Sequence, residues 1–251
     1  GCNLADPAND CDGDGIPNGI EGTVGTNPTV KDNDVWSSAQ LFVMQAYRDL
    51  LLREGDAAGI TANTALLQSG QISRQQLVQT FTEGGEFQGS IAPVIRLYLA
   101  ALGRIPDAGG LRYWVAQYRA GQSLDWIADQ FALSPEFLAN YGSIVDSLYI
   151  SLLYQNLLGR PADAAGLDNW VAQLAYRSRG SVLAGFSESQ EYRESQAATV
   201  SVTGLYDGLL ARPPGGTELA SARAALSSGT PISQWAAVLV YSGEYRARFM
   251  P

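Results

Sequence analysis

The sequence has no histidine, and its only lysine is Lys31. Without histidine there is no histidine-based catalytic triad and no histidine ligand of the kind that catalytic zinc favours. A single lysine likewise argues against Schiff-base chemistry. These absences remove most common enzymatic mechanisms and leave hydrolysis by paired carboxylates possible in principle.

Basic surface and long apolar runs are missing too. The net charge at pH 7 is −9, and residues 1–34 carry seven of the 25 acidic residues. Binding to nucleic acid needs a basic face, so we expect no nucleic-acid partner. No apolar run reaches the length of a membrane span, so we expect a protein that is not transmembrane. Apolar residues make up 46% of the chain, which is typical of a folded protein.

Cysteine is almost absent, because Cys2 and Cys11 are the only two and they flank a short acidic segment. Their spacing suits a disulfide loop in an exported protein. The other interpretation is that Gly1-Cys2 ends a lipoprotein signal and that Cys2 is lipidated. No signal peptide is visible, so we expect it to have been removed near Gly1 from a secreted protein.

Residues 10–21 place oxygen-bearing groups at the spacing of a calcium loop. Counted from the first aspartate, the expected Ca²⁺ ligands are Asp10, Asp12, Asp14, the carbonyl of Ile16, Asn18 and Glu21. They fall at positions 1, 3, 5, 7, 9 and 12, with a glycine at position 6 for the sharp turn. A solvated acidic linker is the other interpretation, but every ligand position is filled in register, which favours calcium.

The segment after this loop differs from the long exit helix of an EF-hand. Gly25-Thr-Asn-Pro and the later Asp32-Asn-Asp34 resemble the thrombospondin type 3 calcium repeat of exported bacterial proteins. The resemblance implies a second ion at Asp32 and Asp34, although Asn27 stands where that repeat has aspartate.

The rest of the chain repeats a motif four times, with an arginine six residues after a tyrosine and a glutamate-aromatic pair closing the copy. The tyrosines are Tyr47, Tyr98, Tyr154 and Tyr206, and the closing pairs are Glu86-Phe87, Glu136-Phe137, Glu191-Tyr192 and Glu244-Tyr245. The distance from tyrosine to closing aromatic is 40, 39, 38 and 39 residues. Such regularity indicates repeats at about 40–90, 91–142, 143–197 and 198–251.

The spacing of apolar and capping residues within each repeat predicts three helices. The first carries the tyrosine and a leucine stripe, and the second begins at an aspartate such as Asp107 that can cap free backbone N–H groups. A third helix follows a turn such as 120–123. Ser134-Pro-Glu-Phe137 then opens a further helix, with serine as cap and proline at the first helical position. We therefore expect an all-α fold of four tandem three-helix repeats (36–251) after an irregular calcium-binding segment (1–35).

The repeat resembles the DUF4214 family of bacterial exported and surface proteins. Leu102-Gly-Arg-x-x-Asp-x-x-Gly-Leu111, Tyr113-Trp114 and Ser134-x-Glu-Phe137 carry the resemblance, which extends over roughly residues 40–250. The outer copies depart from the pattern, with Asn63 in place of tryptophan and Gly215 in place of aspartate. The family is defined by sequence, so the resemblance implies a fold and no particular chemistry.

Other candidate sites have simpler structural interpretations. We expect Asp107 and Asp163 to cap helices, with Arg104 and Arg160 tying the preceding helix end to them. Tryptophans at helical spacing are more often core than sugar-stacking platforms, and we expect this of Trp114, Trp126, Trp170 and Trp235. Glutamates in first helical turns, such as Glu136, are better explained by capping than by catalysis.

These observations predict a non-enzymatic, extracellular or cell-surface, calcium-binding structural protein. We expect it to self-associate head to tail, as a subunit of a surface layer or filament, because the chain has few charges and residues 235–241 are strongly apolar. The alternative is an adhesin-like module that binds a carbohydrate or another cell-surface partner.

Overall fold

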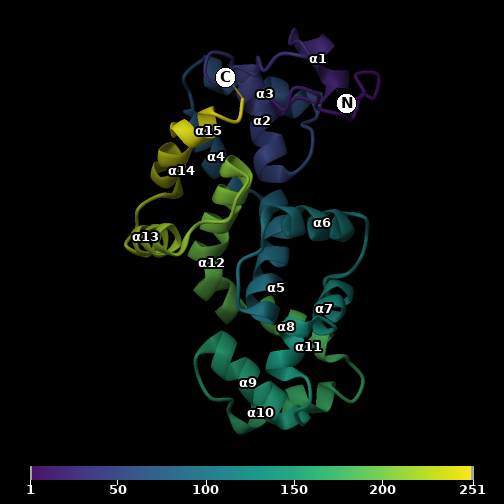
Figure 1. Cartoon of the computed structure of the whole chain (residues 1–251). Coiled ribbons are helices and arrows are strands. Elements are labelled where there is room, and N and C mark those ends of the chain that lie inside the picture. The colour runs from purple at the N-terminus through teal and green to yellow at the C-terminus, as the bar shows by residue number, and fades with distance from the viewer. Residues whose placement is uncertain (1, 250–251) are drawn as a thin grey trace. The chain divides into compact units, whose positions relative to one another are not determined.

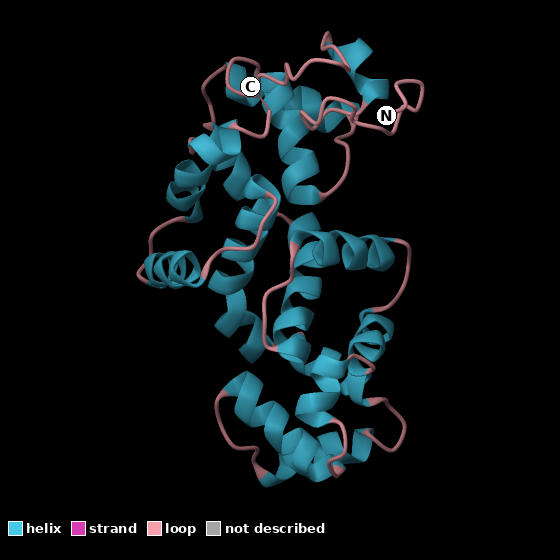
Figure 2. Ribbon diagram, viewed as in Figure 1, coloured by secondary structure: helices cyan, strands magenta, loops and turns pink. Residues whose placement is uncertain are grey.

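The computed structural model describes residues 2–249, and within them every regular element is helical and none is a strand (Figures 1 and 2). This confirms the predicted all-α fold. The chain packs into two compact units. Unit 1 joins the chain up to Phe87 with the chain from Leu205 onwards, and unit 2 is Gln88–Gly204. These two units are defined by packing. The division into segments 1–35 and 36–251, which was based on the sequence, remains a prediction.

Unit 1 contains the elements from both ends of the chain. They are α1 (Asn18–Val24), α2 (Ala39–Leu51), α3 (Ala57–Gln68), α4 (Arg74–Glu83), the π-helical turn η2 (Tyr206–Leu210), α13 (Gly216–Ser227), α14 (Ile232–Val240) and α15 (Gly243–Arg246). Helix α2 packs on α3, α4 and η2, and α14 packs on α4, η2 and α15. The core of unit 1 therefore forms where early and late parts of the sequence meet.

Unit 2 is continuous in sequence. Its helices are α5 (Ala92–Leu102), α6 (Ala108–Arg119), α7 (Leu124–Ala132), α8 (Pro135–Tyr141), α9 (Asp146–Leu158), α10 (Ala164–Gln173), α11 (Arg179–Ser187) and α12 (Gln190–Leu205), whose last residue belongs to unit 1. A π-helical turn, η1 (Phe87–Ile91), precedes α5. Helix α11 packs against α5, α7 and α9, and it is buried along most of its length.

The predicted aspartate and serine caps are in place, whereas the predicted glutamate cap is not, because Glu136 binds Arg104. The carboxylates of Asp107 and Asp163 each accept a hydrogen bond from the N–H three residues on, at 2.8 Å. Ser134 caps α8 by accepting from the N–H of Phe137, and Pro135 stands at the first helical position. Local signals within three residues of each other therefore predicted these helix starts correctly.

The arginines of the motif do not bind the capping aspartates, so this part of the prediction was wrong. Each arginine instead binds the closing glutamate of its own repeat through two nitrogens, at 2.6–3.2 Å. The pairs are Arg53–Glu86, Arg104–Glu136, Arg160–Glu191 and Arg212–Glu244. A planar guanidinium matches a carboxylate in this paired geometry, whereas each aspartate already accepts from its helix.

The same arginines stack over the tyrosines of the motif. The guanidinium carbon lies 5.0, 5.6, 5.1 and 5.3 Å from the ring centres of Tyr47, Tyr98, Tyr154 and Tyr206. We call this arrangement the Tyr–Arg–Glu contact. Its ion pairs are half-exposed, so each adds little to the free energy of unfolding. Its main effect is to fix the closing helix of each copy against the first.

The motif glycine is explained by the tyrosine hydroxyl. A Cβ built on Gly110 would lie 2.4 Å from the hydroxyl oxygen of Tyr98, and the corresponding distance for Gly166 and Tyr154 is also 2.4 Å. In these copies the tyrosine hydroxyl therefore explains the glycine twelve residues later.

The fourth copy satisfies the same needs by a different route. Gly215 cannot cap with a side chain, so Glu218 accepts from the N–H of Gly215 at 2.6 Å. Glu218 also binds Arg212 through two oxygens at 2.8 and 2.9 Å. It occupies the place of the motif glycine, so aspartate and glycine have been replaced by glycine and glutamate together. The hydrogen bonds from Arg212 and Gly215 lower the pKa of Glu218 to about 2.

The tryptophans are only partly core. Trp114, Trp170 and Trp235 are half-buried, but Trp126 is exposed at 37%, so the core prediction was wrong for it. Ile127 and Phe131 fill the core position of α7 instead.

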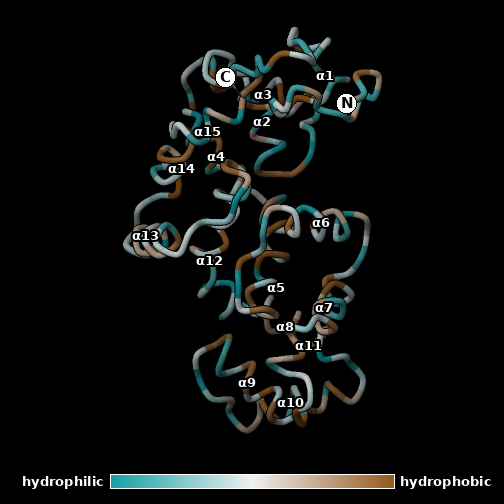
Figure 3. The backbone as a smooth tube through the Cα atoms, viewed as in Figure 1, coloured by the Kyte–Doolittle hydropathy of each residue, from teal (hydrophilic) through white to brown (hydrophobic). Residues whose placement is uncertain are grey.

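Among residues 2–249 no helix is both long and apolar enough to cross a bilayer. Hydrophobic stretches along the chain are short and interrupted by hydrophilic ones (Figure 3).

The first prediction concerns Gly110. Gly110→Ala should lower the free energy of unfolding by about 1–3 kcal/mol, because its methyl group would overlap the Tyr98 hydroxyl. Chemical denaturation measures the change. Gly109→Ala in the same turn is the control, since its nearest atom is 3.3 Å away. Adding Tyr98→Phe should relieve most of the cost, and a cost that stays additive would contradict the explanation.

The second prediction concerns acid. The pKa of Glu218 is lower in the folded protein than its ordinary value of 4.5. Ionised Glu218 therefore stabilises the protein at pH values above about 4.5, and this stabilisation is lost as the pH falls towards 2. Glu218→Gln should therefore reduce stability at pH 7 and flatten the stability profile between about pH 4.5 and 2. Exposed Glu83, which accepts from Gln79, gives the matched control Glu83→Gln. Equal profiles for the two variants would refute the assignment.

Candidate metal centre

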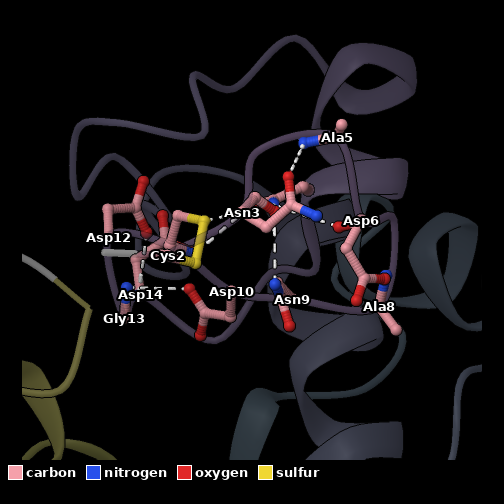
Figure 4. Close-up of a disulfide and its surroundings, with 12 residues drawn as sticks. Cys2, Asn3, Ala5, Asp6, Ala8, Asn9, Asp10, Asp12, Gly13 and Asp14 are labelled. Atoms are coloured by element: carbon pink, nitrogen blue, oxygen red, sulfur yellow. Dashed lines mark hydrogen bonds between the residues drawn. A yellow bond between two sulfur atoms is a disulfide. The ribbon is translucent and has the colours of Figure 1, made fainter.

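The acidic loop is closed at its base by a disulfide. Cys2 and Cys11 are joined, which decides in this structure between the two interpretations of these cysteines. Figure 4 shows the bridge beside Asp10, Asp12 and Asp14. The backbone N–H of Cys11 also donates to the side-chain oxygen of Asn18 at 3.2 Å. The entrance to the loop is therefore held by a covalent bond and by a hydrogen bond from within the loop itself.

Three aspartates of the loop turn their carboxylates inward. Asp10 accepts from the N–H groups of Gly13 and Gly15 at 2.8 and 2.9 Å. Both glycines have positive φ, +73° and +90°, which lets the backbone curl around the carboxylates. One oxygen from each of Asp10, Asp12 and Asp14 lies within 4.8 Å of the others. These are the side chains that the sequence predicted at positions 1, 3 and 5.

A second carboxylate group shares Asp14. Oxygens of Asp14, Glu21 and Asp32 also lie within 4.8 Å of one another. Glu21 comes from α1 and is fully buried, yet neither of its carboxylate oxygens has a hydrogen-bond partner among the described residues. One oxygen of Asp12 is in the same condition. A buried, unpaired carboxylate is costly unless a cation offsets its charge.

The electrostatics reflect this crowding. Burial, together with the neighbouring carboxylates of Asp12, Asp14, Asp32 and Asp10, raises the pKa of Glu21 to about 7. Burial also raises the pKa values of Asp12 and Asp14. Carboxylate repulsion therefore dominates this cluster, although the Lys31 ammonium lies near the loop, 3.9 Å from a Cβ built on Gly13.

Two predicted ligands are engaged elsewhere in this structure. The oxygen of Asn18 accepts from Cys11, and its amide nitrogen donates to the carbonyls of Asn3 and Asp6 at 3.3 and 3.2 Å. Asp34 accepts from the N–H groups of Trp36 and Ser37, and the hydroxyl of Ser37 lowers its pKa. Of the two residues predicted for a second ion, Asp34 acts here as a turn cap and Asp32 joins the group with Asp14 and Glu21.

Ile16 connects the loop to the body of unit 1. Its side chain is fully buried, and its N–H donates to Asp14 at 2.9 Å. Its carbonyl remains the predicted ligand at position 7.

Three buried polar residues behind the loop were not predicted from the sequence. Asn33 donates to the backbone oxygen of Asp14 at 2.9 Å and to Gln45 at 3.1 Å, and Gln45 donates to Asp49 at 2.8 Å. A signal was present, because Gln45 and Asp49 interrupt an otherwise apolar face of α2 four residues apart. Polar residues at core positions need partners, and these connect to the acidic loop.

The group that these residues fit is a hard cation. The inward-facing atoms are carboxylate oxygens, with no sulfur or imidazole among them, and two of the side chains are fully buried. Oxygen-only donor sets of this charge suit Ca²⁺, which takes six to eight such ligands in flexible geometry. Carboxylates Asp10, Asp12, Asp14, Glu21 and Asp32 would hold it.

These features define an all-helical protein built on a recurring motif, with an acidic N-terminal loop. The chain belongs to the family described as a domain of unknown function (DUF4214), whose model matches residues 32–91 and 128–196, just over half of the chain. No curated protein matches the chain. The family carries no assigned activity, so the function must be argued from the residues.

Proposed function

We propose that the protein is a non-enzymatic calcium-binding structural protein that acts outside the cell or at its surface. The observation that carries the proposal is Glu21, a fully buried carboxylate without a hydrogen-bond partner, beside Asp14 and Asp32. A divalent cation there would offset the repulsion among these groups and occupy the oxygens that no N–H reaches.

An extracellular setting is supported by two features of the N-terminal segment. The disulfide between Cys2 and Cys11 is of a kind that persists in oxidising compartments. Extracellular calcium modules bind with dissociation constants on the order of 10⁻⁴–10⁻³ M, which suits the millimolar calcium found outside cells.

A structural role is supported by the way the motif carboxylates are used. Glu136, Glu191 and Glu244 were the candidates for paired catalytic acids, and each is held by its own arginine. Hydrogen bonds from these arginines lower the pKa values of Glu191 and Glu244. A carboxylate kept ionised in this way is poorly suited to donate a proton.

Carbohydrate binding is the second candidate, and one observation favours it. Tyr113 and Trp126 are exposed at 55% and 37%, and both flank the half-buried Trp114, with ring centres 4.9 and 6.3 Å from it. Exposed aromatic faces of this kind can stack on sugar rings. Loss of glycan binding in Trp126→Ala, with folding unchanged, would support this candidate.

The third prediction tests the ion. Asp12→Ala combined with Glu21→Ala should abolish calcium binding measured by titration calorimetry, because both carboxylate clusters lose a member. Asp34→Asn is the control, since Asp34 caps a turn and asparagine can do the same. It should leave the affinity unchanged. Calcium binding retained by the double variant would refute the proposed site.

The fourth prediction concerns self-assembly. We propose that protein molecules associate head to tail, with the acidic segment of one molecule against the helical body of the next. Val238 on α14 and Tyr241, which directly follows that helix, are exposed at 61% and 57%, which supports an apolar contact in the stretch 235–241. A contact between two different surfaces makes rings or filaments rather than simple dimers. Sedimentation in calcium at micromolar protein should therefore show species larger than a dimer.

The matched control for assembly is Val238→Glu, which places a charge in the proposed contact and leaves the calcium ligands untouched. It should return the protein to a monomer in calcium. A monomeric wild type under the same conditions would refute the assembly proposal and favour the carbohydrate-binding candidate.

A further inference from the structure

A continuous buried chain of hydrogen bonds leads from the acidic loop into the core of unit 1. The N–H of Asn33 donates to a carboxylate oxygen of Asp14 at 2.9 Å, and its side-chain amide donates to the Asp14 carbonyl and to Gln45. Gln45 passes the chain to Asp49 at 2.8 Å. Asn33, Gln45 and Asp49 are exposed by only 0, 2 and 2%.

The far end of this chain holds the last helix of the protein. The hydroxyl of Tyr245 donates to one oxygen of Asp49 at 3.0 Å, and Arg248 donates to the other at 2.9 Å. Arg248 also donates to the carbonyls of Gly208 and Leu209 in η2. Asp49 is thus the buried anion on which α15 and the residues after it are fixed.

The loop also touches this chain directly. Gly15 has φ +90°, and a Cβ built on it would lie 2.9 Å from the side-chain oxygen of Gln45. Backbone of the acidic loop therefore rests against the amide that bridges Asn33 and Asp49. A loop displaced at Gly15 or Asp14 removes the contacts that orient Gln45.

Charge repulsion acts on the same segment. Asp32 and Asn33 are adjacent, and both of their N–H groups donate to one carboxylate oxygen of Asp14, at 3.1 and 2.9 Å. Asp32 is also a member of the cluster with Glu21. Without a cation, repulsion among these carboxylates pushes against the backbone that positions Asn33, and a bound cation removes that force.

We propose that calcium binding at the acidic loop and docking of α15 are thermodynamically coupled through Asn33, Gln45 and Asp49. The inference rests on the proposed function, because it takes the acidic loop as the calcium site. Coupling of this kind is reciprocal, so calcium tightens the docking of α15 and a well-docked α15 raises the calcium affinity by the same factor. None of the three residues need touch the ion, and they act as positioning residues behind its ligands.

The test combines calorimetry with amide hydrogen exchange of residues 243–249 in the full chain. In the wild type, saturating calcium should slow exchange in this segment. Gln45→Ala, which retains every predicted ligand, should weaken calcium affinity roughly 10-fold or more and abolish the slowing at saturating calcium. Val78→Ala is the control. Val78 is a fully buried apolar residue of α4 that takes no part in the hydrogen bonds through Asn33, Gln45 and Asp49, so this variant should keep the calcium affinity within about two-fold.

A second variant keeps the test valid if Gln45→Ala fails to fold. Tyr245→Phe removes only the hydroxyl at the far end of the chain and keeps the ring contacts with Trp36 and Phe249, whose centres lie 5.8 and 5.0 Å away. It should lower calcium affinity in the same direction by a smaller factor. A structural role alone would change the stability of unit 1 without changing that affinity.

The outcomes separate the two proposals. A wild type that binds no calcium overturns both. Calcium binding without slower exchange in residues 243–249 overturns the coupling and leaves the calcium site standing. Slower exchange that is equal in the wild type and in Gln45→Ala also overturns the coupling, since Gln45 would then carry none of it.

Discussion

In each copy of the motif an arginine lies between a tyrosine ring and the glutamate that closes the copy, and much of the surrounding structure follows from that placement. In the first three copies the tyrosine hydroxyl leaves no room for a Cβ at one position of the second helix, which explains the motif glycine. The arginine binds the closing glutamate, so the aspartate remains available to cap the start of the second helix. The guanidinium interacts with the ring by stacking on its face and with the carboxylate by lying in its plane. The contact therefore fixes the relative orientation of these side chains more than it adds to the free energy of unfolding.

The fourth copy shows which parts of this arrangement are interchangeable. There the capping carboxylate and the small residue have exchanged places, and Glu218 both caps the helix start and binds Arg212. The requirement is thus for one carboxylate near the helix start and one position that tolerates the tyrosine hydroxyl. A pattern of identities would describe this copy as degraded, although Glu218 binds both Arg212 and the backbone of Gly215.

The sequence predicted what depends on neighbours and missed what depends on distant parts of the chain. Asp107 and Ser134 cap groups three residues away, so their roles follow from spacing alone. The partner of Arg104 is 32 residues along, and no local rule selects Glu136 over the nearer Asp107. In the acidic segment, Asp10, Asp12 and Asp14 form one carboxylate group, and Asp14, Glu21 and Asp32 form another. The side chains of Asn18 and Asp34 accept hydrogen bonds from backbone N–H groups, which spacing alone does not predict.

Unit 1 is assembled from the two ends of the chain, with all of unit 2 inserted between them in the sequence. A ribosome therefore finishes unit 2 while unit 1 is still half made, lacking η2 and α13 to α15. During that interval Asp49 has neither Tyr245 nor Arg248 as a partner, and a strongly apolar helix, α2, lacks its later neighbours. The order of synthesis thus makes the last segment of the chain the step that completes the first.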